Sequence, residues 1–517
     1  MERLSAKHNV IGRAVIVVAT LLLAAAAAGA ANVYTQDNAP AAPAVEDLPL
    51  RDSVTQYWIT WRFDKKVPVG RFVNGDYYVV GPVTVTMIDP KPWVGAEVSE
   101  DELDATEQRK IKDVNDRVRN GSVLNPPAKQ EVGWDSGVKN WFNRKLTTLP
   151  PIELKPGDSL VSTISMKLGD RPDFPYHAGG ERAKGDNSPV KTAAVLTCMA
   201  EPQPADAFRP GYCDTTNKVY LARNLKREML GTLPKPKDTP DLKTWVRVFQ
   251  RPWVNLGFFG FDQPMENMPQ YGQWVGQAQS IGGLMLMLDF APEEKEPLLV
   301  NMVQVGIDLW SAVKNGHPGW EGWGGHGSGR KFPIVLAGVL LDDEEMAAPT
   351  VAFPKCNFGE DNQTMYGDCW TGAKVCFAGH SGMHQDEIPR KHWGPYEHLN
   401  PKDWKNEGDR KNFQSEAYRR ANSSSSWPGQ ALVIRMLGAE KQWNHDAFFD
   451  YVDRWMYEDD KEFRHEINKY FPDKNLASDE AKWFYQGQAW EPFVTEMFLK
   501  YRPTLAAPTD GWKKGKR

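Results

Sequence analysis

The sequence has little excess charge and no short internal repeat. Its 62 basic and 67 acidic side chains leave a net charge of −5 over 517 residues. A protein that binds DNA or RNA needs a basic surface to neutralise phosphates, so this balance argues against nucleic acid as a partner. The lack of a short repeat argues against a solenoid. The length allows two or three domains with at least one large core.

Cysteine is scarce, and the five that are present are Cys198, Cys213, Cys356, Cys369 and Cys376. The first two are close enough in sequence to close a short loop, and the last three offer one more disulfide with one thiol left over. A zinc site built from the last three together with His380 and His384 is the alternative, but these spacings match no standard zinc finger. We therefore predict disulfides and no metal site.

The N-terminus has the pattern of a secretory signal. Three basic residues precede an apolar run at 14–28, and Ala28-Gly29-Ala30 provides the small residues that signal peptidase prefers. We predict a signal peptide over 1–31, or an uncleaved anchor, because the 18 residues of 14–31 reach the lower limit for spanning a bilayer. Both alternatives predict a secreted or periplasmic protein whose only contact with a membrane is such an anchor.

The first half of the chain has the pattern of strands. Residues 32–50, rich in Ala and Pro, predict a flexible linker. Short β-branched and aromatic segments bounded by turn residues follow at 57–63, 77–80, 83–88, 159–166 and 192–199. They predict a β-sandwich-like domain over 51–235, which ends at the proline-rich run 233–237.

After residue 245 the apolar residues recur every three or four positions, as in amphipathic helices. These stripes lie at 271–288, 299–313, 333–341, 428–437, 448–456 and 490–501. Strands followed by helices indicate a two-domain chain. For 240–503 we predict an (α/α) toroid, a ring of helical hairpins whose loops form a cleft at one end, followed by a basic tail over 504–517.

The most informative stretch is a glycine loop just before one predicted helix. Five glycines between 322 and 329 let the backbone come close to a ligand, and Trp323, His326 and Arg330 lie among or beside them. The apolar run that begins at Pro333 predicts a buried helix that anchors the loop, which is what an active site needs. The alternative is a loop between helices in which a carbonyl satisfies His326.

Three further segments carry candidate site residues. Asn267 and Tyr271 lie before a predicted helix, where Asn267 either donates to a substrate carboxyl group or caps the helix. Tyr366 lies in a polar segment with Glu360, either as a cleft residue or on a plain surface loop. The run 418–422, with Tyr418, Arg419, Arg420 and Asn422, suits an anionic ligand, although a solvated charged face is the alternative.

The residue types favour one reaction class. Hydrolysis of a glycosidic bond usually needs two flanking carboxylates, and the glycine loop has no such pair. Elimination from a uronic acid instead needs donors that stabilise the enediolate, a base for the C5 proton and an acid for the leaving oxygen. Tyr and His can serve as base and acid when nearby cations lower the tyrosine pKa.

Three motifs resemble a known family: Asn-Met-Pro-x-Tyr at 267–271, Gly-Gly-His-Gly-Ser-Gly-Arg at 324–330 and Tyr-Arg-Arg-x-Asn at 418–422. They resemble polysaccharide lyases with an (α/α) toroid, of the alginate or glucuronan lyase type, over roughly residues 245–500. In many toroid lyases the β-rich part follows the helices, whereas here it comes first.

The resemblance implies catalysis without a cofactor. Asn267 and either Arg330 or Arg420 would neutralise the substrate carboxylate, His326 would act as base or neutraliser, and Tyr418 as acid or acid/base. The implied substrate-binding residues are Tyr271, Trp323, Arg330, Tyr366, Arg419 and Asn422.

We therefore expect a secreted lyase that cleaves a uronate-containing acidic polysaccharide by β-elimination. One alternative is a glycoside hydrolase on the same toroid, with acids drawn from Glu266, Asp289, Asp342, Asp343 or Glu360. The other is a non-catalytic glycan-binding envelope protein.

Overall fold

The computed structural model describes residues 31–94, 118–136, 142–166, 190–257, 267–269, 272–378, 397, 399–406, 420–472, 475–478 and 486–515. The predicted signal segment and the candidate residues Glu266, Tyr271, Tyr418 and Arg419 lie outside them, apart from residue 31 of the signal segment. Among the described residues, no helix is both long enough and apolar enough to cross a bilayer.

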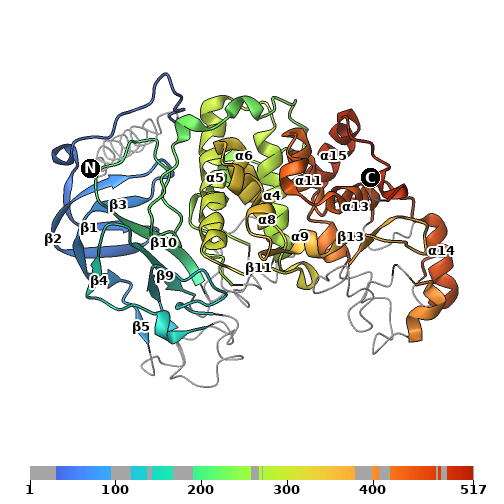
Figure 1. Cartoon of the computed structure of the whole chain (residues 1–517), viewed down its shortest axis with the longest axis horizontal. Helices are drawn as coiled ribbons and strands as arrows, with labels where there is room; N and C mark the ends of the chain where they lie inside the picture. Colours follow the sequence, from blue (N-terminus) through green and yellow to red (C-terminus); the bar gives the residue numbers. More distant parts are fainter. Residues whose placement is uncertain are drawn as a thin grey trace, which may run out of the picture.

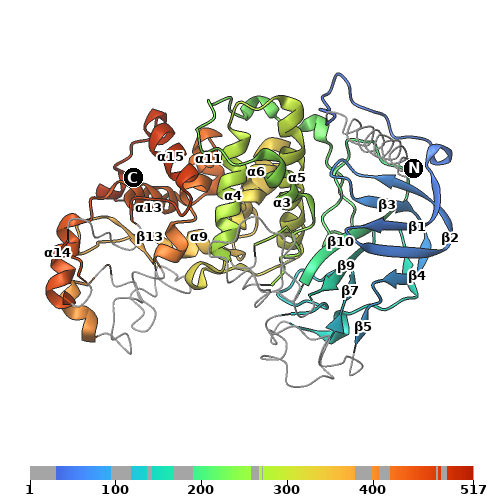
Figure 2. The ribbon, with the colours of Figure 1, turned by 180° about the vertical axis from the view of Figure 1, so that it is seen from behind.

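The chain is a mixed α and β structure in which a curled β-sheet precedes the helices. In Figure 1 the sheet lies at one end of the molecule, α4–α6 lie in the middle and α11–α15 lie at the other end, and Figure 2 shows the same order from behind. The strands of the large sheet are β1 (Leu50–Gln56), β2 (Ile59–Arg71), β3 (Tyr77–Val80), β4 (Val83–Asp89), β7 (Ser122–Leu124), β8 (Ile152–Leu154), β9 (Ser159–Ser165) and β10 (Val190–Met199). Their order is β7-β9-β10-β3-β2-β4-β8, with β1 also on β2.

Strand β2 connects the two halves of this sheet. It pairs with β1 through its first residues and again at Val67 and Pro68, and its first residues also pair with β4. Its last three residues pair with β3, which is parallel to β10. Alternate side chains of β2 are buried, as a period-two pattern requires. Trp61 of β2 is fully buried and donates to Ser162 of β9 at 3.0 Å, so both halves share one core. The predicted strands therefore exist, but they form one continuous curled sheet and not two separate sheets.

One predicted strand begins too early. We predicted a strand over 57–63, whereas Tyr57 and Trp58 form a tight turn between β1 and β2 with φ of 48° and 66°. Two residues at positive φ match the right-handed twist of a hairpin. The guanidinium of Arg251 lies over both rings, and the Tyr57 hydroxyl donates to the Gln250 carbonyl at 3.1 Å. These contacts to the end of a distant helix stabilise aromatic residues where glycine or asparagine is usual.

The described helices are α3 (Leu242–Gln250), α4 (Gly272–Leu286), α5 (Pro292–Lys314), α6 (Lys331–Leu341), α7 (Glu344–Ala347), α8 (Pro349–Ala352), α9 (Gly359–Asn362), α11 (Pro428–Met436), α12 (Glu440–Trp443), α13 (Asp446–Tyr457), α14 (Lys461–Tyr470) and α15 (Pro492–Tyr501). The six predicted helices correspond to α4, α5, α6, α11, α13 and α15 and are confirmed. The prediction missed α3 and α14, in addition to the short helices. Short strand pairs are β5 (Trp93–Val94) with β6 (Val118–Arg119), β11 (Gly319–Trp320) with β12 (Asn357–Phe358), and β13 (Thr364–Tyr366) with β14 (Val375–Phe377).

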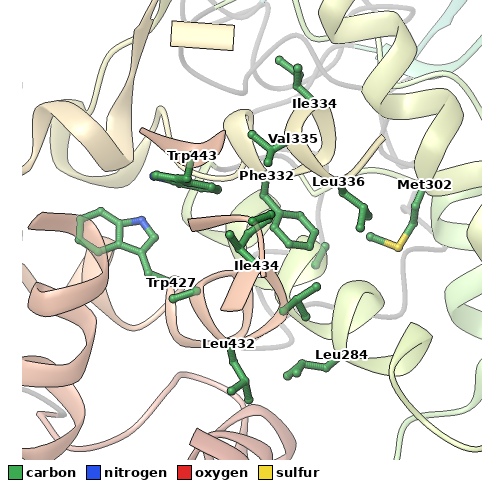
Figure 3. Packing of buried hydrophobic residues seen from close by; sticks show 14 of the residues in the cluster. Leu284, Met302, Phe332, Ile334, Val335, Leu336, Trp427, Leu432, Ile434 and Trp443 are labelled. Carbon is green, nitrogen blue, oxygen red and sulfur yellow. The ribbon is translucent and has the colours of Figure 1, made fainter. Parts of the chain in front are cut away.

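Glycines let the central helices approach closely. A Cβ on Gly306 of α5 would overlap the Pro333 carbonyl of α6, and a Cβ on Gly429 of α11 would lie 2.5 Å from Ser280 of α4. Figure 3 shows side chains of α4, α5, α6 and α11 gathered around Phe332. They belong to one apolar cluster that extends through the helical part. This cluster gives a rigid base to the loops at the ends of these helices.

A buried ionic group joins the sheet to the helices. Arg209 donates to Asp76, in the turn before β3, at 2.6 Å, and makes two bonds to Asp308 of α5 at 2.9 and 2.6 Å. All three side chains are almost fully buried. Gln304 of α5 also accepts from the Arg209 amide at 3.0 Å. Each charge therefore has a partner, as burial in a low-dielectric interior demands.

The terminal segments of the described chain are packed against the rest of the fold. In the predicted linker, the side chain of Gln36 donates to Asn224 at 2.6 Å, and the carbonyl of Pro40 accepts from Arg223 at 2.7 Å. In the predicted tail, Trp512 is buried and its carbonyl accepts from the Lys374 amide at 2.7 Å.

The five cysteines are buried free thiols, so the predicted disulfides are not formed in this structure. Cys198 lies in the core of the sheet, whereas Cys213 belongs to a different apolar cluster and its amide donates to Ser311 of α5. Closeness in sequence does not bring this pair together, because Cys198 packs in the cluster with Leu160 and Leu196, whereas Cys213 packs in the cluster with Val161 and Val195.

Candidate functional site

The glycine loop lies where several distant segments meet. A Cβ on Gly272, the first residue of α4, would overlap the carbonyl of His326, and a Cβ on Gly325 would lie 3.0 Å from the Asn422 carbonyl. A Cβ on Gly329 would lie 2.6 Å from the amide nitrogen of Gly276. The loop therefore needs glycines for close packing against α4 and the segment 420–427. His326 itself is half-buried at this junction.

Arg330 braces the glycine loop from inside. It is fully buried, and its Nη1 donates to the carbonyls of His326 and Ser328 at 2.8 and 2.5 Å. Its Nη2 donates to Asn255 at 3.3 Å. Burial lowers the pKa of Arg330 to about 9, which still leaves it protonated at neutral pH. Arg330 thus fixes the backbone beside His326, and its positive charge lies beneath the loop.

Glu360 lies under the same loop. This first-turn residue of α9 is fully buried, and its Oε1 accepts from the Gly329 amide at 2.5 Å. Its Oε2 has no hydrogen-bond partner among the described residues. Burial raises the pKa of Glu360 to about 7, although the Gly329 amide and the charge of Arg330 act in the opposite direction. Glu360 can therefore hold or release a proton near neutral pH.

A polar seam between α4 and α11 supports the loop from the other side. The Ser280 hydroxyl donates to the Ser426 carbonyl at 2.8 Å, and Gln430 donates to the Gly276 carbonyl at 3.2 Å. The indole of Trp427 donates to the hydroxyl of Ser328 in the loop at 3.2 Å. The sequence pattern did not predict this seam. The run of four serines at 423–426 was its one visible signal.

The residues of the motif at 418–422 have different surroundings. Asn422 is half-buried next to Gly325. Arg420 is buried, donates to Tyr451 and Gln486 at 3.0 Å each, and pairs with Glu397 at 3.4 Å. The guanidinium of Arg420 is thus held within the protein.

The other predicted site residues also have internal contacts. Asn267 is buried, and its amide donates to the carbonyls of Val248 and Arg251, at the end of α3, at 3.3 and 3.1 Å. The indole of Trp323 donates to Glu321 at 3.0 Å. The structure brings His326, Arg330 and Asn422 together through the loop and places Asn267 on the end of α3.

Tyr366 lies in a separate small pocket. Its hydroxyl donates to Asp450 of α13 at 2.8 Å, and the pocket of about 200 Å³ also has Arg435, Glu440 and Asp446 in its lining. The guanidinium of Arg435 donates to Glu440 at 2.9 Å.

The acids considered for hydrolysis are dispersed. Asp342 pairs with Lys226 at the surface, and Asp343 accepts from Lys218 and from the hydroxyl of Tyr220. Asp289 is exposed. Of the acids in this set that the structure describes, Glu360 alone lies under the glycine loop.

Two larger pockets border the helices of the C-terminal part. One, of about 510 Å³, includes Trp490 and Glu496, and the Trp490 amide donates to the Ser425 carbonyl in the serine run at 3.0 Å. The other, of about 660 Å³, lies between the turn 370–373 and α14 and combines aromatic side chains with acids such as Glu462. Aromatic faces beside polar groups suit sugar rings as well as other small ligands.

No protein-family model, curated protein or solved structure matches this chain.

Proposed function

We propose that this chain is a secreted polysaccharide lyase that cleaves a uronate-containing acidic polysaccharide by β-elimination. In this proposal the helices belong to an (α/α) toroid that follows the curled β-sheet. The observation that carries it is the contact of Gly325 with the Asn422 carbonyl. It brings His326, on the glycine loop, close to the segment that follows Tyr418.

The proposed reaction uses groups from both segments. The substrate carboxylate must be neutralised before the C5 proton becomes acidic enough to be removed. The Asn422 amide is the donor that we assign to this task, with the buried charge of Arg330 behind the loop. His326 then takes the C5 proton, the bond from C4 to the glycosidic oxygen breaks, and Tyr418 gives a proton to the leaving oxygen.

The contacts of Arg330 make it a positioning residue. Its Nη1 donates both of its hydrogen bonds to the carbonyls of His326 and Ser328 in the loop. Arg420 and Asn267 likewise donate to groups of the protein. The proposal therefore relies on His326, Tyr418 and Asn422 for contact with the substrate, and Trp490 provides an aromatic face near the serine run.

The test is a screen of alginate, glucuronan, chondroitin and heparinoids for unsaturated products, whose C4–C5 double bond absorbs ultraviolet light. The wild type should produce this absorbance on at least one uronate glycan. His326→Ala and Tyr418→Phe should lose turnover but keep glycan binding. The exposed His465 of α14 offers the matched control, since His465→Ala should be as active as the wild type. Full activity of His326→Ala at an unchanged unfolding midpoint would contradict the proposal.

A glycoside hydrolase is the second candidate, and Glu360 favours it. A carboxyl group with a pKa of about 7 can act as a general acid at neutral pH. A hydrolase would release new reducing ends without ultraviolet absorbance. Binding to glycans without any product would instead favour a non-catalytic glycan-binding protein.

A further inference from the structure

Two cysteines face each other in the hairpin formed by β13 and β14. Cys376, in β14, lies opposite Met365 of β13, and Cys369 begins the turn that connects the strands. The Gly372 amide donates to the Cys369 carbonyl at 2.9 Å, and the Cys369 amide donates to the Ala373 carbonyl at 2.8 Å. The turn thereby holds the two sulfur atoms 3.0 Å apart, and both side chains are buried.

The third cysteine of this region is not part of the arrangement. Cys356 lies before β12. Burial raises the pKa of its thiol, and the charged side chains that also shift this pKa are Lys331 and Asp361. The geometry therefore distinguishes one pair among the three cysteines that the sequence left open.

The same two sulfurs lie near Glu397, and the three residues are close enough to hold a metal ion. The charges around these three residues disfavour the binding of a metal ion. Arg454 donates to Glu397 at 3.0 Å and approaches the Cys369 sulfur at 3.4 Å, and Arg420 pairs with Glu397 at 3.4 Å. Two guanidinium groups already neutralise the carboxylate, and a divalent cation placed there would be repelled by both.

Protonation of the Cys369 thiol also disfavours a metal ion. The hydrogen bond with Cys376 and burial raise the pKa of the Cys369 thiol far above its ordinary range. A metal ion binds thiolates, which this environment disfavours. A disulfide needs no buried charge.

We propose that Cys369 and Cys376 form a disulfide when the chain folds in the presence of a small-molecule disulfide such as oxidised glutathione. The sulfur atoms need to approach by roughly 1 Å to reach the length of a disulfide bond. The two thiols give up two protons and two electrons, one S–S bond forms in the protein, and the S–S bond of glutathione breaks to give two glutathione thiols. The inference does not depend on the proposed lyase activity.

The bond would fix one wall of the pocket of about 660 Å³. The turn that it closes contains Trp370 and Thr371, which line this pocket opposite α14. Trp370 packs edge-on against Phe463 of α14, with ring centroids 6.0 Å apart, and Thr371 donates to Glu458 at 3.3 Å. Reduction would leave these weaker contacts to hold the wall.

The test is to refold the full chain with oxidised glutathione, quench with acid, and count free thiols after denaturation. The wild type should retain three of its five thiols. A peptide that joins Cys369 to Cys376 should be found by mass spectrometry without reductant and should disappear with it.

Two variants make the test specific. Cys356→Ser is the matched control and should still form the bond, whereas Cys376→Ser should keep all four of its remaining thiols free. Five free thiols in the oxidised wild type, or a bond that involves any other cysteine, would overturn the proposal. So would stoichiometric zinc that survives dialysis and protects Cys369 and Cys376 from alkylation in the wild type but not in Cys376→Ser.

Discussion

The buried carboxyl of Glu360 should make the stability of this protein depend on pH. Its pKa is about 7 in the folded chain, against an ordinary value of 4.5. A group whose pKa is higher in the folded state binds its proton more tightly there, so it stabilises the fold below its ordinary pKa. This contribution is lost as the pH rises through 7.

The size of the effect follows from the two pKa values. One pKa unit corresponds to about 1.4 kcal/mol, and integration of the linkage relation gives a loss of roughly 2–3 kcal/mol in unfolding free energy between pH 5 and pH 8. Glu360→Gln keeps the shape of the side chain and an oxygen that can accept from Gly329, but it cannot ionise. We therefore expect the variant to lose less stability than the wild type over this range, by about this amount.

Denaturant unfolding followed by tryptophan fluorescence, at a series of pH values, measures this difference. Glu462→Gln, on the exposed side of α14, is the matched control and should follow the wild type. Parallel pH profiles for wild type and Glu360→Gln would refute the raised pKa. Such a result would also remove the argument that Glu360 can act as a general acid.

Two further substitutions test how the fold is joined. Arg209→Met leaves the buried carboxylates of Asp76 and Asp308 without their cation and should destabilise the protein by about 3–5 kcal/mol. Arg51→Met, at an exposed position, is the control and should leave the stability unchanged. Equal unfolding midpoints for the two variants would contradict the role of the ionic group. Gly306→Ala places a methyl group against the Pro333 carbonyl and should destabilise the protein by about 1–3 kcal/mol; an unchanged thermal midpoint would show that α5 and α6 can separate without loss.

Local pattern was enough to place most of the regular structure. The helices α4, α5, α6, α11, α13 and α15 follow from apolar residues spaced three or four apart, because that period repeats within each segment. The strands β3, β4, β9 and β10 follow from β-branched residues between turn signals. The same pattern predicts a strand at Tyr57 and Trp58, which is wrong. Their turn is stabilised by contacts with Arg251 and Gln250, almost 200 residues away, and a local pattern contains no sign of them.

The sequence by itself determined six of the longer helices, five strands of the sheet, their order along the chain and the position of the glycine loop before a buried helix. Only the tertiary structure decided what meets that loop and which charges remain inside the protein. Arginine is a residue type that often binds ligands. Arg330 and Arg420, however, are both buried and donate to partners within the protein such as Asn255, Tyr451 and Gln486. The physical reason is that the spacing of apolar residues indicates which face of a helix or strand is buried. The partner of a buried charge, or of a cysteine, depends instead on how distant elements pack.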